Sequence, residues 1–587
     1  MSMMKIKFPM VPSDYVFKEK YFLKDAKTQP VFFKYKVKFL GGYSQNYTIK
    51  WLEIFSRYNG ISANIIQSEW GPGHYFISDP DIFNDRPDLF VVFLLPQDFY
   101  SLSRTSSPME EISEIRSNIY KFVKECEKKK INIVFSTLET DLISFPDTIK
   151  NNSFLSFSID LNKTLNEINL AYKNVLIFSI SNICSGFEFE NYVSTRDWYA
   201  FGNPFNINAS FLIGNYLNNH IRGLLGLSKK VLVTDLDNTL WGGVIGDDGP
   251  GNIKIGNETP EGRIFADLQM YIYHLSKRGI FIAISSKNEK HLALEGFMNE
   301  NSILKITDFA NAEINWNIKS ESIRSISKFL NVGLESVFFL DDNPVEREEV
   351  NSSCPEVLVP NVSDDPFTFL QALKFYDPFC IGVKPLEEDI SRNHSIKSIK
   401  QQTDLLANVK SYNEFLKNLS IKVTIQKISD KNFDRVLQLN NKTNQFNFTT
   451  LRLKQDELSE IMNNQNNLNL TYSVSDKFTN YGLTGIIFLE IGKDKIIVNN
   501  WVMSCRVFKK TVEIAILNEV VKVASNKKIM KIHLKYISTI KNSLLLSFLK
   551  DNGFQQLKQN TSAFDFQEWV LDLSKKLEFK HYIEVLT

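Results

Sequence analysis

Cysteine is scarce in this chain of 587 residues, and no two cysteines form a CxxC pair. The five are Cys126, Cys184, Cys354, Cys380 and Cys505. An odd number of widely spaced cysteines fits neither a structural zinc site nor a disulfide framework. The first residues lack the apolar stretch of a secretory signal, and no run approaches the roughly 20 apolar residues of a membrane span. We therefore expect a cytoplasmic protein with reduced thiols.

An excess of charge of either sign is also missing. Lysine and arginine together number 68, aspartate and glutamate 67, and the formal net charge is +1. This balance gives no reason to expect nucleic acid or an anionic membrane as a partner. What the chain does have is 43% hydrophobic and 13% aromatic residues, enough to fill several cores. Its length indicates three or four domains of about 150 residues each.

The first predicted domain covers residues 1–227. Its short apolar runs, at 37–42, 89–95 and 131–136, are separated by stretches of helical length. Continuous apolar runs spaced in this way predict a parallel sheet that is buried between helices.

The second predicted domain covers residues 228–380 and repeats the alternation. VLVTD, FIAIS and VFFLDD read as buried strands, and Thr259-Pro260 predicts the capped start of a helix that ends near Gly279. A polar stretch at 381–417 then reads as a solvated linker. Residues 418–587 begin with strands and place their long helices late, which predicts an α+β domain.

The strongest candidate site lies in the second domain. KKVLVTDLDNTLWGG places Asp235 at the carboxyl end of a buried strand, and Asp237 follows two residues later. Ligands bind at that edge of an open parallel sheet. Two carboxylates so close together suit Mg²⁺, which leaves Asp235 able to attack phosphorus as a nucleophile. Asp237 is then placed to act as general acid and base.

Further polar residues follow in an order that completes such a site. Ser286 ends the strand FIAIS, Lys319 lies near a helix start, and Asp341 and Asp342 close the strand VFFLDD. A serine hydroxyl and a lysine offset charge on a phosphoryl group, and the two aspartates are candidate metal ligands. The alternative is that these acids only cap helices, as Asp342 before NPVEREEV could.

These motifs resemble a known family. DLDNTLWGGVIGDDG, SSKN, INWNIKSESI and FLDDNPVER look like the haloacid dehalogenase (HAD) superfamily, subfamily IIIC, and within it the FkbH-like group. NKTNQFNFTT, NYGLTG and WVMSCRVF resemble that group's carboxyl domain, which is related to GNAT acyltransferases. The resemblance implies an α/β chain of three domains: a domain like SGNH hydrolases or flavodoxin, a Rossmann-like HAD domain with little or no cap, and a GNAT-like α+β domain.

The resemblance also implies an activity. FkbH-like proteins take 1,3-bisphosphoglycerate, remove phosphate, hold the glyceryl unit as an enzyme thioester and pass it to an acyl carrier protein. By this resemblance Asp235 is the nucleophile, Asp237 the acid/base, and Ser286 and Lys319 hold phosphate. The same resemblance gives Mg²⁺ as the cofactor, with the ligands Asp235, Asp237, Asp341 and Asp342. It predicts as substrate-binding residues Asn238, Thr239, Lys287, Asn288 and Arg506.

Thioester chemistry needs a thiol, and Cys505 is the best candidate. Basic residues follow it at Arg506, Lys509 and Lys510, and positive charge favours a reactive thiolate. The alternative is an inert, half-buried cysteine. Two departures from the family pattern bear on the mechanism. Ser285 stands where relatives usually have cysteine, and Lys509 and Thr511 stand where they tend to have glycine. Side chains in that turn hinder close approach of a pyrophosphate, so binding of coenzyme A or phosphopantetheine there is not expected.

Two weaker patterns stay open. Ser44 follows an apolar run, as the nucleophile of an SGNH esterase does, but Asp197 is followed three residues later by Ala200 instead of histidine. His74 and His220 are the alternatives, and a binding or scaffolding role fits this domain better than catalysis. The amides of NKTNQFN either bind an acyl or pantetheine amide or make local turns.

The favoured function is therefore removal of phosphate from a small phosphorylated acyl donor, coupled to transfer of a glyceryl-like hydroxyacyl unit to an acyl carrier protein. One alternative is a phosphatase acting alone on a small phosphate ester. Another is a module that docks carrier proteins without catalysis. Phosphate release that survives Cys505→Ala would indicate the first alternative.

Overall fold

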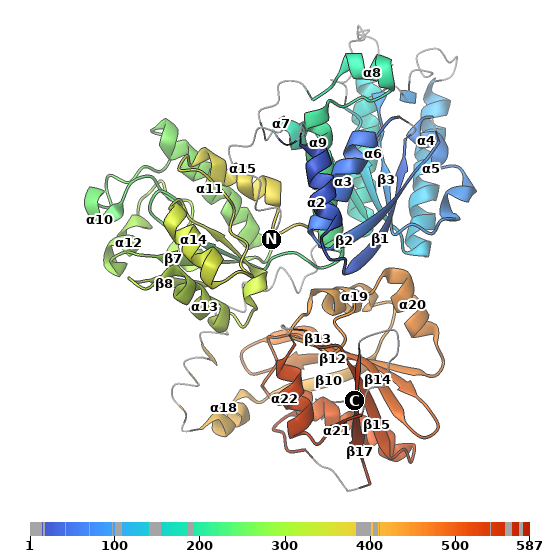
Figure 1. The fold of residues 1–587 in the computed structure, drawn as a ribbon, viewed down its shortest axis with the longest axis vertical. Coiled ribbons are helices and arrows are strands. Elements are labelled where there is room, and N and C mark those ends of the chain that lie inside the picture. The colour runs from blue at the N-terminus through green and yellow to red at the C-terminus, as the bar shows by residue number, and fades with distance from the viewer. Residues whose placement is uncertain are drawn as a thin grey trace. The chain divides into compact units, whose positions relative to one another are not determined.

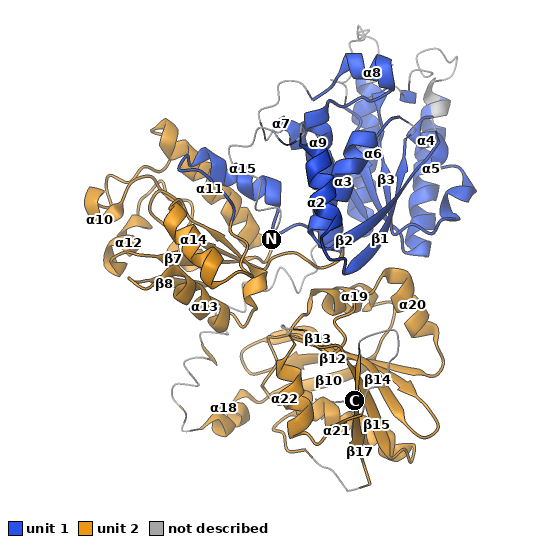
Figure 2. Ribbon diagram, in the orientation of Figure 1, with its two compact units in different colours: residues 1–224, 360–384 blue, residues 225–359, 385–587 orange. Residues whose placement is uncertain are grey.

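A computed structural model gives the fold of the chain (Figure 1). It divides into two compact units, residues 1–224 with 360–384 and residues 225–359 with 385–587 (Figure 2). The predicted linker at 381–417 lies largely outside the described residues. Among the described helices, none combines the length and the apolar character that a bilayer crossing requires. The described residues are 15, 18–41, 43–69, 71–96, 98–99, 108–139, 154–185, 187, 192–382, 401–402, 405, 409, 411–539, 542–557, 566–574 and 579–586.

The first unit is built on a five-stranded sheet with the order β2-β1-β3-β4-β5. Every neighbouring pair of strands is parallel, as the continuous apolar runs predicted. The chain moves from β1 outward to β2 and then crosses to β3, so the connections on the two sides cover opposite faces of the sheet. The strands are β1 (Phe33–Leu40), β2 (Ile61–Gln67), β3 (Leu89–Val92), β4 (Asn132–Ser136) and β5 (Val175–Phe178).

Helices cover both faces of this sheet. On one face, α5 and α6 pack Phe122 and Leu161 against the apolar residues of the strands. Elsewhere in the unit, α3 packs closely on α9 at Gly214, which has no side chain. A Cβ at this position would lie 2.8 Å from Trp51 Cβ and 2.9 Å from the Leu52 nitrogen, so a larger residue would not fit. The helices are α2 (Glu19–Lys27), α3 (Asn46–Tyr58), α4 (Gly73–Phe76), η2 (Pro80–Phe83), α5 (Pro108–Lys129), α6 (Phe154–Ala171), α7 (Ile180–Ser185), α8 (Thr195–Phe201) and α9 (Ile207–Leu224).

Helix α15 (Phe367–Tyr376) belongs to the same unit, although it falls inside the predicted domain 228–380. Polar side chains of α9 bind its last carbonyl groups, which have no partner within a helix. Asn215 donates to the Phe375 carbonyl at 2.7 Å and Arg222 donates to the Tyr376 carbonyl at 3.0 Å. These side-chain contacts to the main chain tie α15 to the first unit.

The second unit begins with a four-stranded parallel sheet of order β8-β7-β6-β9. The Thr259 hydroxyl accepts from the Gly262 N–H at 3.0 Å and Pro260 opens α11, so the predicted cap is confirmed. Between β6 and α11 only the short α10 forms, so this segment is far too small for a cap domain. The elements are β6 (Val231–Thr234), α10 (Ile245–Asp248), α11 (Pro260–Lys277), β7 (Phe281–Ser286), α12 (Lys290–Gly296), η5 (Ile306–Asp308), β8 (Asn311–Ile314), α13 (Lys319–Phe329), η6 (Leu334–Ser336), β9 (Val337–Leu340) and α14 (Pro344–Ser353).

The rest of the second unit is an α+β domain around a nine-stranded, mostly antiparallel sheet. Alternate residues of β13 face two cores: Ile487 and Leu489 meet α21 and α22, and Ile486 and Phe488 meet α19 and α20. The helices are α18 (Tyr412–Leu419), α19 (Phe433–Lys442), α20 (Gln455–Asn463), α21 (Val512–Asn526) and α22 (Leu544–Asp551). The strands are β10 (Lys422–Lys427), β11 (Phe446–Asn447), β12 (Asn467–Ser475), β13 (Asn480–Ile491), β14 (Ile496–Met503), β15 (Lys531–Tyr536), β16 (Gln555–Gln556), β17 (Gln567–Asp572) and β18 (Glu584–Leu586).

Candidate active site

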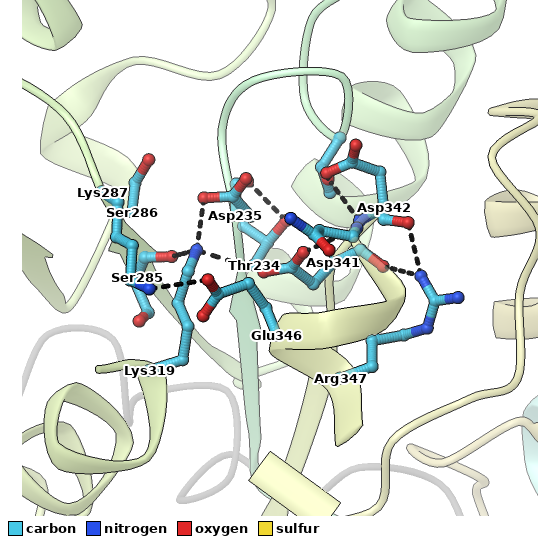
Figure 3. A network of polar contacts seen from close by, with 12 residues as sticks. Thr234, Asp235, Ser285, Ser286, Lys287, Lys319, Asp341, Asp342, Glu346 and Arg347 are labelled. Carbon is cyan, nitrogen blue, oxygen red and sulfur yellow. Dashed lines mark hydrogen bonds and ion pairs between the residues drawn. The ribbon is translucent and has the colours of Figure 1, made fainter. Parts of the chain in front are cut away.

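The carboxyl ends of β6, β7 and β9 bring three of the predicted acids, Asp235, Asp341 and Asp342, together with Ser286 (Figure 3). Asp235 follows β6, Ser286 ends β7, and Asp341 follows β9. The three strands are parallel neighbours, with Thr234 in register with both Ile284 and Leu340, so their ends share one edge. Each of these side chains is buried. The site therefore lies where an open parallel sheet binds its ligands.

Lys319 is the first residue of α13, and its side chain reaches the carboxyl ends of these strands. Its Nζ donates to Asp235 Oδ1 at 2.6 Å and to the Ser285 carbonyl at 2.6 Å, and it pairs with Asp341 Oδ2 at 3.1 Å. Three partners match the three protons of an ammonium group. Burial lowers the pKa of Lys319, but the Asp235 and Asp341 carboxylates outweigh burial and the net shift is upward. The lysine therefore carries its charge inside the site.

Three carboxylates at this edge can hold a metal ion. Oxygen atoms of Asp235, Asp341 and Asp342 all lie within 4.8 Å of one another. Burial, and then the nearby Asp235, raises the pKa of Asp341 to about 7, while Lys319 opposes this shift. The same two causes raise the pKa of Asp342. Such crowding of like charges is relieved by a hard divalent cation with oxygen ligands, so this set of donors fits Mg²⁺.

The loop after β9 is held in place by side chains from two other segments. The Thr239 hydroxyl accepts from the Asp342 N–H at 3.1 Å and donates to Asp342 Oδ1 at 3.3 Å. Arg347 in α14 donates to the carbonyls of Asp341 and Asp342, at 2.8 and 2.6 Å (Figure 3). These contacts orient both acids toward Asp235. Thr239, predicted to bind substrate, is thus engaged with Asp342.

Asp237 lies outside the group of three carboxylates. Its Oδ1 accepts from Trp241 Nε1 at 2.9 Å and from the Ile245 N–H at 3.2 Å, and its Oδ2 accepts from Asn288 Nδ2 at 2.9 Å. Burial raises the pKa of Asp237 although these donors oppose the shift. A carboxyl group that is held by donors and inclined to keep its proton suits a general acid better than a metal ligand.

The remaining predicted binding residues surround this centre. Asn288 also donates to the Ser286 hydroxyl at 3.2 Å, which links Asp237 to the end of β7. Lys287 pairs with Glu346 of α14 at 2.6 Å (Figure 3). Asn238 is exposed and has a positive φ of 51°, and its Oδ1 accepts from the Gly243 N–H at 2.9 Å. Asn288 is thus hydrogen-bonded to two residues of the site, Asp237 and Ser286. Lys287 and Asn238 instead contact neighbouring residues, Glu346 and Gly243.

Sequence reasoning missed Arg347, Trp241 and Glu346. Arg347 acts through main-chain carbonyls, and Trp241 reaches Asp237 from four residues along the chain. The only available signal for Arg347 was a basic residue in the acidic run NPVEREEV, close behind Asp341 and Asp342.

Cys505 and Arg506 lie elsewhere in the second unit. Cys505 follows β14, is half-buried, and accepts a hydrogen bond on its carbonyl from Asn331. It lines a cleft together with Lys230 and Phe281, which stand at the amino ends of β6 and β7. Asp235 stands at the carboxyl end of β6, about 16 Å from Lys230 at the usual rise of a strand. The predicted thiol therefore lies near the amino ends of the strands of the four-stranded sheet, and the predicted phosphoryl site lies at their carboxyl ends.

The turn before α21 fits a pyrophosphate poorly, as expected from Lys509 and Thr511. Both have positive φ, 66° and 64°, the conformation that favours glycine. The Glu513 carboxylate accepts from the backbone N–H of Lys509 and from its own N–H, and burial raises its pKa to about 7. Two N–H groups near this helix start, those of Lys509 and Glu513, are therefore already engaged by the chain's own carboxyl group.

The gap between β14 and β15 is also filled. The two strands pair in parallel only as far as Val498 and Leu534, and beyond that point β11 pairs with β14 instead. The Ile537 N–H then donates to the Phe448 carbonyl at 2.8 Å. An extended ligand could pair with such diverging strands, but residues 446–448 already occupy the gap. Neither feature of this domain favours coenzyme A.

In the first unit, the two histidines considered for esterase chemistry are engaged separately. The His220 Nδ1 contacts the Ile381 carbonyl at 3.1 Å, and burial lowers its pKa to about 4. The ring of His74 stacks on Phe99 at 4.8 Å between centroids. Asp197 lies in the first turn of α8, where its N–H donates to the Ser194 hydroxyl. None of these contacts involves Ser44, and a binding or scaffolding role for this domain stays a prediction.

Comparison with solved structures finds a phosphatase. The chain resembles the crystal structure of the N-terminal part of BF1531 from Bacteroides fragilis, which contains a phosphatase domain and is complexed with Mg. The identity is 28%, the TM-score is 0.55, and the match covers 62% of this chain and 99% of that one. This likeness and the two parallel sheets confirm the predicted α/β fold with several domains.

Weaker likenesses are to acetyltransferases. The ribosomal-protein-S18-alanine N-acetyltransferase of Escherichia coli is 11% identical, with a TM-score of 0.22, and covers 27% of this chain and 99% of its own length. A GNAT-family acetyltransferase of Streptococcus pneumoniae is 15% identical, with a TM-score of 0.21, and covers 26% and 100%. These likenesses are too slight to support a statement about activity. No model of a protein family and no curated protein sequence matches the chain.

Proposed function

We propose that this chain is a Mg²⁺-dependent phosphoryl-transfer enzyme of the haloacid dehalogenase type, with Asp235 as its nucleophile. The observation that carries the proposal is the ion pair of Lys319 with Asp235 and Asp341 beside Asp342. These residues place a carboxylate nucleophile, a buried cation and a site for a divalent ion together at the carboxyl ends of the strands. The likeness to a phosphatase domain complexed with Mg supports both the reaction class and the metal.

The residues have distinct roles in the reaction. An Asp235 carboxylate oxygen bonds to phosphorus, and the ester oxygen leaves with a proton from Asp237. In the second step Asp237 takes a proton from water, the water oxygen bonds to phosphorus, and inorganic phosphate leaves as Asp235 is restored. Lys319 and the Ser286 hydroxyl offset negative charge on the phosphoryl oxygens. Asp235, Asp341 and Asp342 would hold Mg²⁺, which would supply charge neutralisation at this edge.

We further propose that the substrate is a small phosphorylated hydroxyacyl donor of the bisphosphoglycerate kind. Its two phosphates need different chemistry. Attack of Asp235 on the phosphorus of an acyl phosphate would release a free carboxylate, and the acyl group would no longer be activated. Asp235 must therefore attack the phosphorus of the phosphate ester. A thiol attacks the acyl carbon instead and displaces the other phosphate. The acyl unit then passes to a carrier protein.

Phosphate release from phosphoglycerate and related esters tests the first proposal. We expect Mg²⁺-dependent release by the wild type, none above background by Asp235→Asn, and normal release by Asp267→Asn, whose side chain is exposed on α11. Release by Asp235→Asn equal to that of the wild type would overturn the assignment. Intact mass after exposure to bisphosphoglycerate tests the acyl step, where absence of an added glyceryl mass in the wild type contradicts it.

A phosphatase acting alone is the second candidate, because Cys505 lies at the edge opposite Asp235. It requires phosphate release in Cys505→Ala at the wild-type rate and no acylated form of the protein. Acylation that is lost in Cys505→Ala, with phosphate-ester hydrolysis retained, supports the coupled reaction instead.

A further inference from the structure

Lys287 and Glu346 form an ion pair beside the carboxylate site, with 2.6 Å between Nζ and Oε1 (Figure 3). Lys287 directly follows Ser286, the last residue of β7, and Glu346 lies in the first turn of α14. The two side chains are 33% and 16% exposed, so solvent reaches the pair. A ligand that enters from solution can therefore reach it as well.

Both partners of this pair project from segments that the site holds in place. Asn288 Nδ2 donates to the Ser286 hydroxyl at 3.2 Å, which fixes the short segment that carries Lys287. Arg347, the residue after Glu346, donates to two carbonyl groups of the loop after β9, at 2.8 and 2.6 Å, and so fixes the first turn of α14. The Lys287 ammonium group thus lies next to the serine that is proposed to contact the phosphoryl group.

The two lysines of the site differ in the donors that remain for a ligand. Lys319 uses its three protons on two carboxylates and one carbonyl group. In the described part of the chain, the structure gives the Lys287 ammonium group one partner, Glu346 Oε1. An ammonium group has three protons, so Lys287 keeps donors for a group of the substrate.

The ion pair itself is easily exchanged. A pair that solvent reaches contributes little to stability, because water competes for both charges. Replacing Glu346 by an anionic group of a ligand therefore costs little, and the new contact is a charge-assisted hydrogen bond. An uncharged group at the same place gains no such bond. The pair can therefore distinguish substrates by the charge of their leaving group.

We propose that Lys287 binds a second anionic group of the phosphate ester, and that Glu346 limits this contact by competing for the same ammonium group. The inference rests on the proposed function and states which esters the site favours. They are esters whose leaving group carries a carboxylate or a further phosphate close to the ester oxygen. The phosphoryl group then lies at Ser286 and Lys319, and the second anion lies at Lys287.

Two substrates that differ in one group test this contact in the full chain. 3-Phosphoglycerate has a carboxylate where glycerol 3-phosphate has an uncharged hydroxymethyl group. We expect the wild type to prefer phosphoglycerate in kcat/KM, and Lys287→Met should reduce this preference about tenfold, since one charge-assisted contact is lost. The loss should lie in KM, because the contact forms before the chemical step. An equal loss for both substrates would indicate a merely structural ion pair and overturn the proposal.

Glu346→Gln tests the competition. Glutamine keeps the size of the side chain without its charge, so the preference for phosphoglycerate should rise about threefold, the size expected for an exposed ion pair. The double variant with Lys287→Met should show the same preference as Lys287→Met alone, because Glu346 acts through Lys287. A rise that persists in the double variant contradicts this role of Glu346.

Two exposed residues provide matched controls. Glu348→Gln lies on the same helix as Glu346, and Lys277→Met lies at the end of α11. Both should keep the wild-type preference. Lys287→Arg keeps the charge and should retain most of it. Should Lys287→Met hydrolyse neither substrate, Glu346→Gln decides alone, and an unaltered preference in that variant overturns the proposal.

Failure here can be told apart from failure of the proposed function. Hydrolysis of both substrates by the wild type with equal kcat/KM overturns the inference and leaves the phosphatase standing. If the wild type hydrolyses neither substrate, nor p-nitrophenyl phosphate, faster than Asp235→Asn does, the proposed function fails and the inference fails with it.

Discussion

Lys319 Nζ lies 2.6 Å from Asp235 Oδ1, which joins the first residue of α13 to the residue that follows β6. The lysine side chain is 4% exposed and that of the aspartate 13%, so water screens the pair little. If Asp235 is the nucleophile, as proposed, a buried cation beside it affects both the chemistry and the binding of a metal. The two effects have opposite signs when the cation is removed.

Replacing Lys319 by methionine should slow turnover and tighten Mg²⁺ binding. The transition state loses a positive charge, which typically costs about 10²–10³-fold in kcat. The carboxylates of Asp235 and Asp341 lose their competing cation, so their affinity for Mg²⁺ rises. Steady-state rates and a Mg²⁺ titration measure the two effects. Lys328→Met, exposed at the other end of the same helix, should change neither, and weaker Mg²⁺ binding in Lys319→Met would contradict this account.

Asp237→Asn should discriminate between leaving groups. Asparagine keeps an acceptor for Trp241 and the Ile245 N–H but cannot give a proton to the departing oxygen. An alkyl phosphate needs that proton, so its hydrolysis should fall by about 10²–10⁴-fold. p-Nitrophenyl phosphate, whose leaving group is stable as an anion, should lose much less. An equal loss for both substrates would show that Asp237 is not the general acid.

Mg²⁺ should stabilise the folded chain through the three carboxylates. At a hundred times its dissociation constant, a ligand that binds only the folded state adds about 2.7 kcal/mol. Asp341→Asn removes a buried like charge beside Asp235, so this variant should melt higher than the wild type without Mg²⁺ and gain little when Mg²⁺ is added. Thermal melts with EDTA and with Mg²⁺ test both parts. A full Mg²⁺-induced shift in Asp341→Asn would exclude it as a ligand.

The meeting of these side chains at one end of the sheet was predictable because apolar runs reveal buried strands, and the carboxyl ends of parallel strands converge. Asp235, Ser286 and Asp341 needed no more than that rule. Side-chain contacts to carbonyl groups leave no such signal, which is why the role of Arg347 was missed. The attachment of α15 to the first unit was missed for the same reason, since side chains of α9 bind its main-chain carbonyl groups. The distance between Cys505 and Asp235 depends on how the second unit packs, which local sequence does not encode.

The last prediction concerns Asp98 in the first unit, near the carboxyl ends of β1 and β3. Burial raises the pKa of Asp98 to about 7, although Tyr43 and the backbone N–H groups of Leu95 and Gly73 oppose the shift by donating hydrogen bonds. An aspartate in the unfolded chain loses its proton at a pH of about 4. Between these two values the folded chain holds more protons than the unfolded chain, so stability falls as pH rises from about 4 to about 7.

Asp98→Asn removes this loss because an amide stays neutral at every pH. Relative to the wild type, its Tm should therefore rise on going from pH 5 to pH 8, and the difference should level off above pH 8. Thermal melts of the two proteins across this range measure it, with Asp267→Asn as an exposed control. A difference in Tm that stays constant from pH 5 to pH 8 would mean that Asp98 is already ionised in the folded protein. The Tyr43, Gly73 and Leu95 donors would then outweigh its burial.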